Sequence, residues 1–552
     1  MRQQAHLLAV ALVVCIGCRH LPNRSDGATR AATAKIVILG GIGGSGGQPS
    51  PGEFKPMVAK TDALPINGVA YNLSHQGGYF ADQCMDGKSV ITDAMVRPDT
   101  ELMRSFQFRN LTDNFVRLNI AAALTADWFD DAAWQAILAK IAVASRAAKA
   151  GGAVGFMLDN EQYNGQPYNY TAQAHRVEKS FDQYREQVRR RGQEFMRALG
   201  SALPHPKLLM LYGNAALYTC DPAGKTPLSV SQMGLWPPFL DGMMDADATA
   251  EFIDGFEQAY HYRSFAQFAE GREIIKEKAA GFSQDPARYR KRIKVGFGLW
   301  LHAMKQGEGK LNTTDFTQNS YTPDEFRHAI HYALRLSDGY IWLYSVPWFS
   351  LPAEYLAAVR EARQPQALDF QPLKRDEDPR GNYIISAKGR PDCADAVVFA
   401  AYRNAGKVEL YDFPKTWRFR FDPQDAGIRA KWWATPLDQD WLALEIGDWW
   451  EPQLKLNYYG FAWYRFAFDV PAAWQGRKLR LVFGAVDEDA WIWVNGQKAG
   501  EHALGPEGWN SAFDLDVTGK LVPGQTNTIA VRVHNSAGVG GIWKSMKLFT
   551  DP

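Results

Sequence analysis

Three acids in two short segments have the types and spacing best suited to chemistry. Asp159 and Glu161 directly follow the apolar run 153–158, and Glu257 directly follows the run 250–256. An acid placed at the end of a buried strand is a candidate for function because burial changes its readiness to ionise. Two carboxyl groups, one protonated and one ionised, are the minimal machinery for cleaving a glycosidic bond. We expect Glu161 to be the general acid, kept protonated by partial burial, with Glu257 as the second carboxylate and Asp159 as its local alternative.

The segments around these acids predict an alternation of strands and helices. Eight short apolar runs between Lys35 and about Ala362 are predicted to be strands: 36–40, 68–73, 114–121, 153–158, 207–212, 250–256, 293–301 and 339–344. The clearest helical patterns lie between them, at 134–150, 174–199, 265–280 and 324–336. Such alternation is typical of parallel βαβ units, and eight strands predict a closed (β/α)₈ TIM barrel. A doubly wound open sheet is the alternative.

In a barrel of this kind the active site lies at the carboxyl ends of the strands. Polar and aromatic side chains collect at the predicted ends: Asn72, His75, Asn119, Asn160, Tyr212, Asn214, Tyr260, Trp300, His302, Trp342, Tyr344 and Trp348. Amides and carboxylates bond sugar hydroxyls, and aromatic faces stack on the C–H faces of sugars, so the set predicts a carbohydrate substrate. We expect Asn160, Asn214, Tyr260 and Trp348 to orient the sugar, whereas Trp342 lies in mid-strand and fits the barrel core equally well.

The pair Asn160-Glu161 resembles the Asn-Glu pair of the large clan of retaining glycoside hydrolases with this fold. The resemblance implies that Glu161 protonates the leaving oxygen and that Asn160 holds the 2-hydroxyl of the sugar. The spacing of Asp159 and Glu161 also resembles the tail of the family-eighteen chitinase motif, in which the Asp positions an acetamido group. The earlier Asp of that motif is replaced by Gly155 or Met157.

The second carboxylate departs from the pattern of that clan. The clan's nucleophile follows the seventh strand, but the run 293–301 carries no acid and leads to His302. Glu257 is therefore the best remaining partner of Glu161, with Asp254 as the rim residue if the sixth strand ends earlier. This departure leaves two other interpretations open: a non-catalytic carbohydrate-binding protein on a degenerate barrel, or a carbohydrate-acting lyase or esterase.

The C-terminal part of the sequence is predicted to be all-β. Residues 364–411 mix charge and proline and are predicted to bridge two domains, whereas from 412 short aromatic runs are punctuated by Gly, Pro, Asn and Asp, and twelve of the 18 Trp lie at or beyond Trp417. Three motifs occur in order: Gly460-Phe461-Ala462-Trp463-Tyr464-Arg465, Trp493-Val494-Asn495-Gly496 and Gly540-Gly541-Ile542-Trp543. They resemble the galactose-binding-like jelly-roll domain of family-two β-galactosidases and β-glucuronidases. The resemblance implies a β-sandwich over 412–552 that supports the active site rather than binding ligand independently.

The N-terminus is predicted to be an export signal. Arg2 precedes the apolar run 7–17, which has the length of a signal-peptide core and is short for a membrane span. The sequence Ile16-Gly17-Cys18 resembles a bacterial lipoprotein cleavage box, which implies lipidation at Cys18, although Cys15 stands where that box usually has Leu. Ordinary secretion is the alternative. We therefore assign 1–34 to the leader and 35–363 to the barrel, and expect an extracytoplasmic protein.

Composition excludes several classes of partner. Lys and Arg total 61 against 60 Asp and Glu, which argues against a nucleic-acid binder because such proteins need a basic excess. The glycines at 40–44 follow a strand but precede no helical pattern, so no dinucleotide cofactor is expected. No second His lies at ligand spacing from His75 or His302, so no metal is expected either. The expected partner is a carbohydrate, with membrane contact only through a lipid at Cys18; the sequence carries no signal for oligomeric state.

Overall fold

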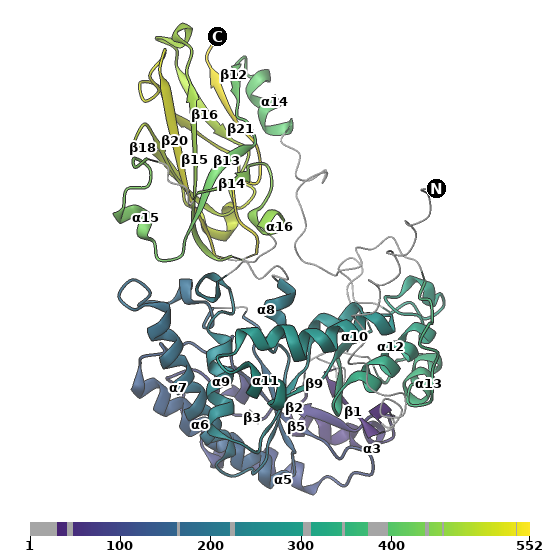
Figure 1. Cartoon of the computed structure of the whole chain (residues 1–552). Helices are drawn as coiled ribbons and strands as arrows, with labels where there is room; N and C mark the ends of the chain where they lie inside the picture. Colours follow the sequence, from purple (N-terminus) through teal and green to yellow (C-terminus); the bar gives the residue numbers. More distant parts are fainter. Residues whose placement is uncertain are drawn as a thin grey trace, which may run out of the picture.

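The computed structural model describes residues 30–31, 33–40, 48–162, 166–220, 227–301, 311–344, 348–373, 396–436, 441–454, 458–536 and 538–552. The first 29 residues of the expected leader, with Cys18, lie outside these ranges, as does His302. Within them the chain forms a parallel sheet surrounded by helices and a separate group of antiparallel strands (Figure 1). None of the helices in the described ranges is both long and apolar enough to cross a membrane.

The N-terminal region is built on one nine-stranded parallel sheet in the order β10-β11-β1-β2-β5-β6-β7-β8-β9. Its strands are β1 (Lys35–Leu39), β2 (Gly68–Tyr71), β5 (Phe115–Asn119), β6 (Gly155–Asp159), β7 (Lys207–Met210), β8 (Glu251–Asp254), β9 (Ile293–Val295), β10 (Gly298–Trp300) and β11 (Tyr340–Tyr344). All eight predicted runs are confirmed as strands, the seventh being divided into β9 and β10. The prediction of an α/β fold with parallel strands is therefore confirmed.

The sheet curls so far that its two terminal strands are consecutive in the chain. β9 pairs with β8 and β10 pairs with β11, and only Gly296 and Phe297 separate β9 from β10. These two residues continue the hydrogen bonding, because the Gly296 amide donates to the Asp254 carbonyl at 2.8 Å and the Trp342 amide donates to the Phe297 carbonyl at 3.0 Å. Because all the strands run parallel, their carboxyl ends lie at the same edge of the curled sheet.

Helices alternate with the strands along the chain and surround the sheet (Figure 1). The longer ones are α5 (Asp93–Ser105), α6 (Asp131–Ala150), α7 (Phe181–Gly200), α9 (Trp236–Ala246), α10 (Phe265–Glu273), α12 (Pro323–Leu336) and α13 (Ala353–Glu361). α7 begins later than the predicted residue 174 because Ser180 and Gln183 form a capping box. The start predicted for α12 is confirmed, since Thr322 and Glu325 form the same motif.

Strand alternation separates an inner from an outer apolar cluster. Val37, Phe115, Met157, Leu209 and Trp342 belong to one buried cluster on the concave side of the sheet. Their neighbours along the strands pack in the much larger cluster that includes the surrounding helices. A side chain on β5 or β6 therefore points inward if its number is odd, a parity that applies to Asp159 as well.

The C-terminal region consists of two antiparallel sheets. One has the order β14-β13-β15-β20-β17-β18 and the other β12-β21-β16-β19. The strands are β12 (Val408–Asp412), β13 (Thr416–Asp422), β14 (Leu442–Glu445), β15 (Gly460–Asp469), β16 (Leu479–Phe483), β17 (Asp489–Val494), β18 (Gln497–His502), β19 (Phe513–Asp516), β20 (Thr526–Asn535) and β21 (Met546–Thr550). A shared core lies between them, with residues such as Phe419, Tyr464 and Leu548 fully buried. An all-β C-terminal region is thus confirmed.

The boundary expected at residue 412 is too late. β12 lies in the predicted bridging segment but pairs with β21, so it belongs to the antiparallel sheets. The helix α14 (Ala396–Asn404) precedes it, and Phe399 of this helix packs against Phe549. The charged residues and prolines of 364–411 do not predict a strand or a helix. β12 and α14 are stabilised by packing against the sheets that follow them in the chain.

The two regions contact one another through the loop that follows β6. The Gln166 amide donates to the Ser536 carbonyl at 2.6 Å, and the Thr171 hydroxyl donates to the Tyr459 carbonyl. Val230, from the segment before α9, belongs to the core cluster of the antiparallel sheets. The segment from Gln166 to Thr171 is therefore bonded to the antiparallel sheets.

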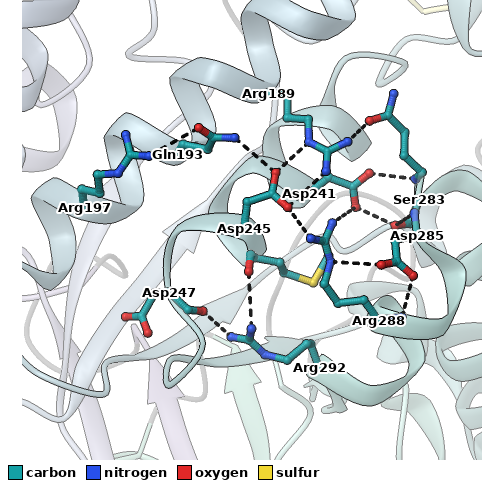
Figure 2. A network of polar contacts seen from close by, with 12 residues as sticks. Arg189, Gln193, Arg197, Asp241, Asp245, Asp247, Ser283, Asp285, Arg288 and Arg292 are labelled. Atoms are coloured by element: carbon teal, nitrogen blue, oxygen red, sulfur yellow. Dashed lines mark hydrogen bonds and ion pairs between the residues drawn. The ribbon is translucent and has the colours of Figure 1, made fainter.

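The helices that follow β6, β7 and β8 are fastened together by charge. Asp245 of α9 accepts hydrogen bonds from Arg189 of α7, at 2.7 Å, and from Arg288 of α11 (Pro286–Arg292), while Asp241 accepts from the Ser283 hydroxyl at 2.6 Å (Figure 2). These three helices follow the strands whose ends carry the candidate site. The network thus fixes the outer layer behind that part of the sheet.

Two glycines allow α7 and α9 to approach closely. A Cβ added to Gly242 would lie 2.0 Å from the Arg189 carbonyl oxygen, and one added to Gly192 would lie 2.1 Å from that of Phe239. Because the obstructing atoms are backbone, a side chain at either position requires the helices to separate.

We expect Gly242→Ala to lower the free energy of unfolding by about 1–3 kcal/mol, because overpacking against backbone forces the two helices apart. Thermal unfolding followed by circular dichroism measures the effect. Gly200→Ala is the matched control, since its added Cβ would meet only Asp247 Oδ2 at an ordinary 3.6 Å. An unchanged melting temperature in Gly242→Ala would contradict close helix packing at this point.

Candidate active site at the carboxyl ends of β6, β7 and β8

The end of β6 is organised by an ion pair on the concave side of the sheet. Arg117 of β5 donates to Asp159 Oδ2 at 2.7 Å, and Asp159 Oδ1 accepts the backbone amide of Glu161 at 3.2 Å. Burial opposes the charge of Arg117, but Asp159 outweighs burial and raises the pKa of the guanidinium. Both oxygens of the Asp159 carboxylate are therefore hydrogen-bonded, one to Arg117 and the other to the backbone amide of Glu161.

A second tie joins the ends of β6 and β7. The Asn160 side-chain amide donates to the Tyr212 carbonyl at 2.8 Å, and the Tyr212 amide donates to Asn160 Oδ1 at 3.0 Å. Asn160 is fully buried, so both of its amide atoms are used within the protein. The tie extends the pairing of the two strands beyond their last ladder residues and fixes Tyr212 beside Glu161.

Tyr212 lies between the two candidate catalytic acids. Its hydroxyl is 3.5 Å from Glu161 Oε1, and it is also hydrogen-bonded to the Glu257 carboxyl, as is Tyr260. Glu257 begins the short 3₁₀ helix η4 (Glu257–His261) just after β8. Two acids separated by almost a hundred positions in the chain thus meet through one phenol.

The two carboxyl groups do not ionise independently. Burial first, and then the negative charge of Glu161, raise the pKa of Glu257 to about 9. Asp159 adds to the same effect, whereas the hydrogen bonds from Tyr260 and Tyr212 oppose it. At neutral pH, Glu257 therefore keeps its proton.

Aromatic rings form the floor beneath this pair. Tyr260 contacts Trp342 edge-on at 5.4 Å and Trp300 at 5.5 Å between ring centroids, and stacks with Tyr344 at 6.1 Å. The Trp342 indole donates to the Gly255 carbonyl at 2.8 Å, which fixes the floor to the end of β8. Burial, followed by the charges of Glu161 and Glu257, raises the pKa of Tyr344, so its hydroxyl stays protonated and faces the same space.

The structure places other predicted residues around the same strand ends with their polar atoms bonded to backbone. Asn119 Oδ1 accepts the amides of Ala121 and Ala123, both at 3.3 Å, and Asn72 Oδ1 accepts that of Ala81 at 3.4 Å. His75 Nδ1 accepts the Gly77 amide at 3.0 Å in a small hairpin of β3 (Ser74–His75) and β4 (Gly78–Tyr79). These groups shape the loops rather than converge with Glu161 and Glu257.

Three of the residues expected to orient a sugar are unsuited to that role. Asn214 is fully buried, and Trp348 is 2% exposed within the core between sheet and helices. Asn160 is committed to the Tyr212 backbone. All three follow a strand in sequence but lie beyond its last residue, so the path of the loop, and not the alternation of the strand, decides where the side chain points. Only Tyr260 of that group reaches the carboxyl pair.

Arg117 and Asp254 are the important residues that sequence reasoning missed or misplaced. Arg117 stands inside the apolar run Phe115–Asn119, and a charged residue in a buried strand is a signal that could have been read. Asp254 is the rim residue only on the alternative in which the sixth strand ends earlier; β8 does end at Asp254, but this side chain is fully buried and accepts backbone amides from two strand ends. Among the described residues, no group of three or more His, Cys, Asp or Glu has an arrangement that could hold a metal ion.

We expect Glu257→Gln to stabilise the protein at alkaline pH. A carboxyl whose pKa is raised on folding contributes stability below its unfolded value, here near 4.5, and loses it as pH rises through the folded value of about 9. Melting temperatures measured from pH 5 to pH 9.5 should coincide for the two proteins at the acid end. At the alkaline end Glu257→Gln should melt several degrees higher, and parallel curves would contradict the raised pKa.

No protein-family model matches this chain. A β-glucuronidase from Paenibacillus borealis is 31% identical over 131 residues, which are 23% of this chain and 21% of that protein. Among solved structures, the β-glucuronidase of Ruminococcus gnavus bound to N1-substituted uronic isofagomine has a TM-score of 0.24 at 19% identity, covering 26% of this chain and 30% of that chain. The same enzyme with D-glucuronic acid gives the same values. The chain spans about a fifth of the length of the curated relative.

Proposed function

We propose that this protein is a glycoside hydrolase in which Glu161 and Glu257 form the catalytic pair. The observation that carries the proposal is the contact of one hydroxyl, that of Tyr212, with both carboxyl groups. That contact brings Glu257, which burial and the negative charge of Glu161 keep protonated, next to Glu161, with Tyr260 and Tyr344 close to both acids. Such a combination suits cleavage of a bond between sugars.

The proposal includes a closed (β/α)₈ barrel and a jelly-roll sandwich. Closure is supported by the hydrogen bonds on both sides of Gly296 and Phe297, which link β8 to β11 through a single stretch of chain. The sandwich is supported by two antiparallel sheets over one core. In this arrangement the sandwich supports the loop that follows Glu161, through Ser536 and Tyr459.

The raised pKa of Glu257 assigns a catalytic role to each of the two acids. Glu257 donates its proton to the glycosidic oxygen as the bond between that oxygen and the anomeric carbon breaks. Glu161, as the ionised partner, stabilises the positive charge that develops on the sugar ring. The oxygen of a water molecule then bonds to the anomeric carbon, and the proton that this water loses returns to the Glu257 carboxylate, which restores the acid. This allocation reverses the roles expected from the sequence, in which Glu161 was the acid, because Glu257 is the partner held in the protonated form.

The substrate is proposed to be a poly- or oligosaccharide. The matched relatives are β-glucuronidases, so β-glucuronides head the set of substrates to be tried. Among the described residues around the pair, Arg117 is already bonded to Asp159, and recognition of a sugar there rests on tyrosine hydroxyls and aromatic faces.

We expect turnover of at least one member of a panel of aryl glycosides and polysaccharides, and loss of at least about 100-fold in kcat for Glu161→Gln and for Glu257→Gln. Chromogenic release and chromatography of the products measure the effect. Lys498→Gln, an exposed substitution in β18, is the control for handling. Equal activity in wild type and Glu161→Gln would remove Glu161 from the mechanism. Saturable binding without product would favour a carbohydrate-binding protein, and an unsaturated product would favour a lyase.

Export and lipidation at Cys18 form a further part of the proposal, supported by the apolar run 7–17 and the residues Ile16-Gly17-Cys18. In a bacterial host fed with labelled palmitate, we expect the protein to carry label and to fractionate with membranes. The variant Cys18→Ala should lose both properties. Secretion of an unlabelled, shortened chain would contradict lipidation but not export.

A further inference from the structure

Asp254 is a buried acid that binds two backbone amides next to the candidate site. It is the last residue of β8, it is fully buried, and its Oδ1 accepts the backbone amides of Gly213 at 3.2 Å and of Phe256 at 3.1 Å. Gly213 follows Tyr212 and Phe256 precedes Glu257. One carboxylate oxygen therefore joins the two peptide units next to the residues that meet in the candidate site.

The backbone beside Glu257 needs such a restraint. Phe256 has φ +42° and ψ +68°, a left-handed conformation that is unfavourable for a bulky residue without outside support. The amides on either side of Phe256 bond to β7 and its end, from Gly255 to the Met210 carbonyl at 2.8 Å and from Glu257 to the Leu211 carbonyl at 3.4 Å. The last bond is long, so the bond to Asp254 is the closer restraint on the direction in which Glu257 leaves the strand.

The space around the carboxylate is fitted to this arrangement. A Cβ added to Gly213 would lie 1.9 Å from Asp254 Oδ2 and 2.2 Å from its Cγ, so a side chain at 213 would displace the carboxyl group. The backbone amide of Ala215 also bonds to the Asp254 carboxyl, whereas neither amide atom of the fully buried Asn214 has a hydrogen-bond partner among the described residues. Burial of a carboxyl group costs free energy, which indicates that Asp254 has a role other than packing.

We propose that Asp254 is a positioning residue that sets the turn at Phe256, and thereby fixes Glu257 against Tyr212 in the catalytic pair. The proposal rests on the proposed function for its catalytic consequence, but the geometry it describes does not. The hydrogen bonds of Asp254 go to backbone amides and not to the carboxyl group of Glu161 or Glu257. It acts on the reaction only through the peptide units that it holds.

The chain offers a matched pair of substitutions to test this role. Asp254→Asn keeps an acceptor oxygen for both amides, whereas Asp254→Leu has a similar size and no acceptor. On the substrate found for the wild type, Asp254→Asn should keep kcat within about threefold. Asp254→Leu should lower kcat on the order of 10–100-fold with little change in KM, because a small misplacement of a catalytic group is enough for such a loss.

A second readout does not depend on turnover. Glu257, facing Glu161, Asp159, Tyr212 and Tyr260, lowers stability as pH rises towards 9, and this loss depends on its being held in its buried position. Both Asp254 variants lack the carboxyl of residue 254, so a difference between their melting curves reports on Glu257. We expect Asp254→Asn to keep the alkaline decline and Asp254→Leu to weaken it, with no difference between them in a Glu257→Gln background.

Gly213→Ala breaks the same contact by displacement and serves if Asp254→Leu does not fold. Gly281→Ala is its control, because an added Cβ there has no atom within 4 Å, and Asp241→Asn controls for loss of a buried acid away from the site. Wild-type kcat and an unaltered alkaline decline in folded Asp254→Leu or Gly213→Ala would overturn the proposal. An equal loss in Asp254→Asn and Asp254→Leu would do the same. Absence of turnover in the wild type would overturn the proposed function alone, and the melting curves would then decide the role of Asp254.

Discussion

Two like charges in a half-buried space repel one another too strongly for both to persist, and this constraint underlies the site. Glu161 and Glu257 meet through Tyr212, and Glu257, enclosed by Tyr260 and the protein interior, is the one that keeps its proton. Burial first, and then the negative charge of Glu161, keep Glu257 protonated, so the two acids differ in their readiness to give up a proton. The aromatic floor strengthens the effect because it excludes water from beneath the pair and so lowers the local dielectric constant.

The precision of this pair depends on polar groups that do not belong to it. Arg117 fixes Asp159, which holds the peptide of Glu161, and Asn160 binds the backbone of Tyr212. Asp254 joins the backbone next to Tyr212 to the backbone next to Glu257. All these side chains are buried or nearly so, and each bonds to backbone or to an opposite charge. Behind them, the charged network among α7, α9 and α11 fixes the helices that follow the same three strands (Figure 2).

Much of the fold could be predicted from the sequence, because buried parallel strands and amphipathic helices leave strong local patterns. The strand runs, the start of α12 and the all-β C-terminal region follow from such patterns. The site was predicted less fully. Position after a strand identified Glu161 and Glu257, but it could not tell that Asn160 and Asn214 turn into the protein, since facing depends on where the strand ends. Nor could it assign Asp254 to two backbone amides, because these contacts join residues from different strands.

The contacts of the loop after β6 impose an order of events on the growing chain. Gln166 and Thr171 bind to Ser536 and Tyr459, partners that lie 370 and 288 positions later in sequence. During synthesis from the N-terminus, the parallel sheet emerges from the ribosome long before either partner exists. The contacts of Gln166 and Thr171 can therefore form only after the C-terminal sheets have been synthesised and folded, so the segment that follows β6 reaches its final form later than the strand that precedes it.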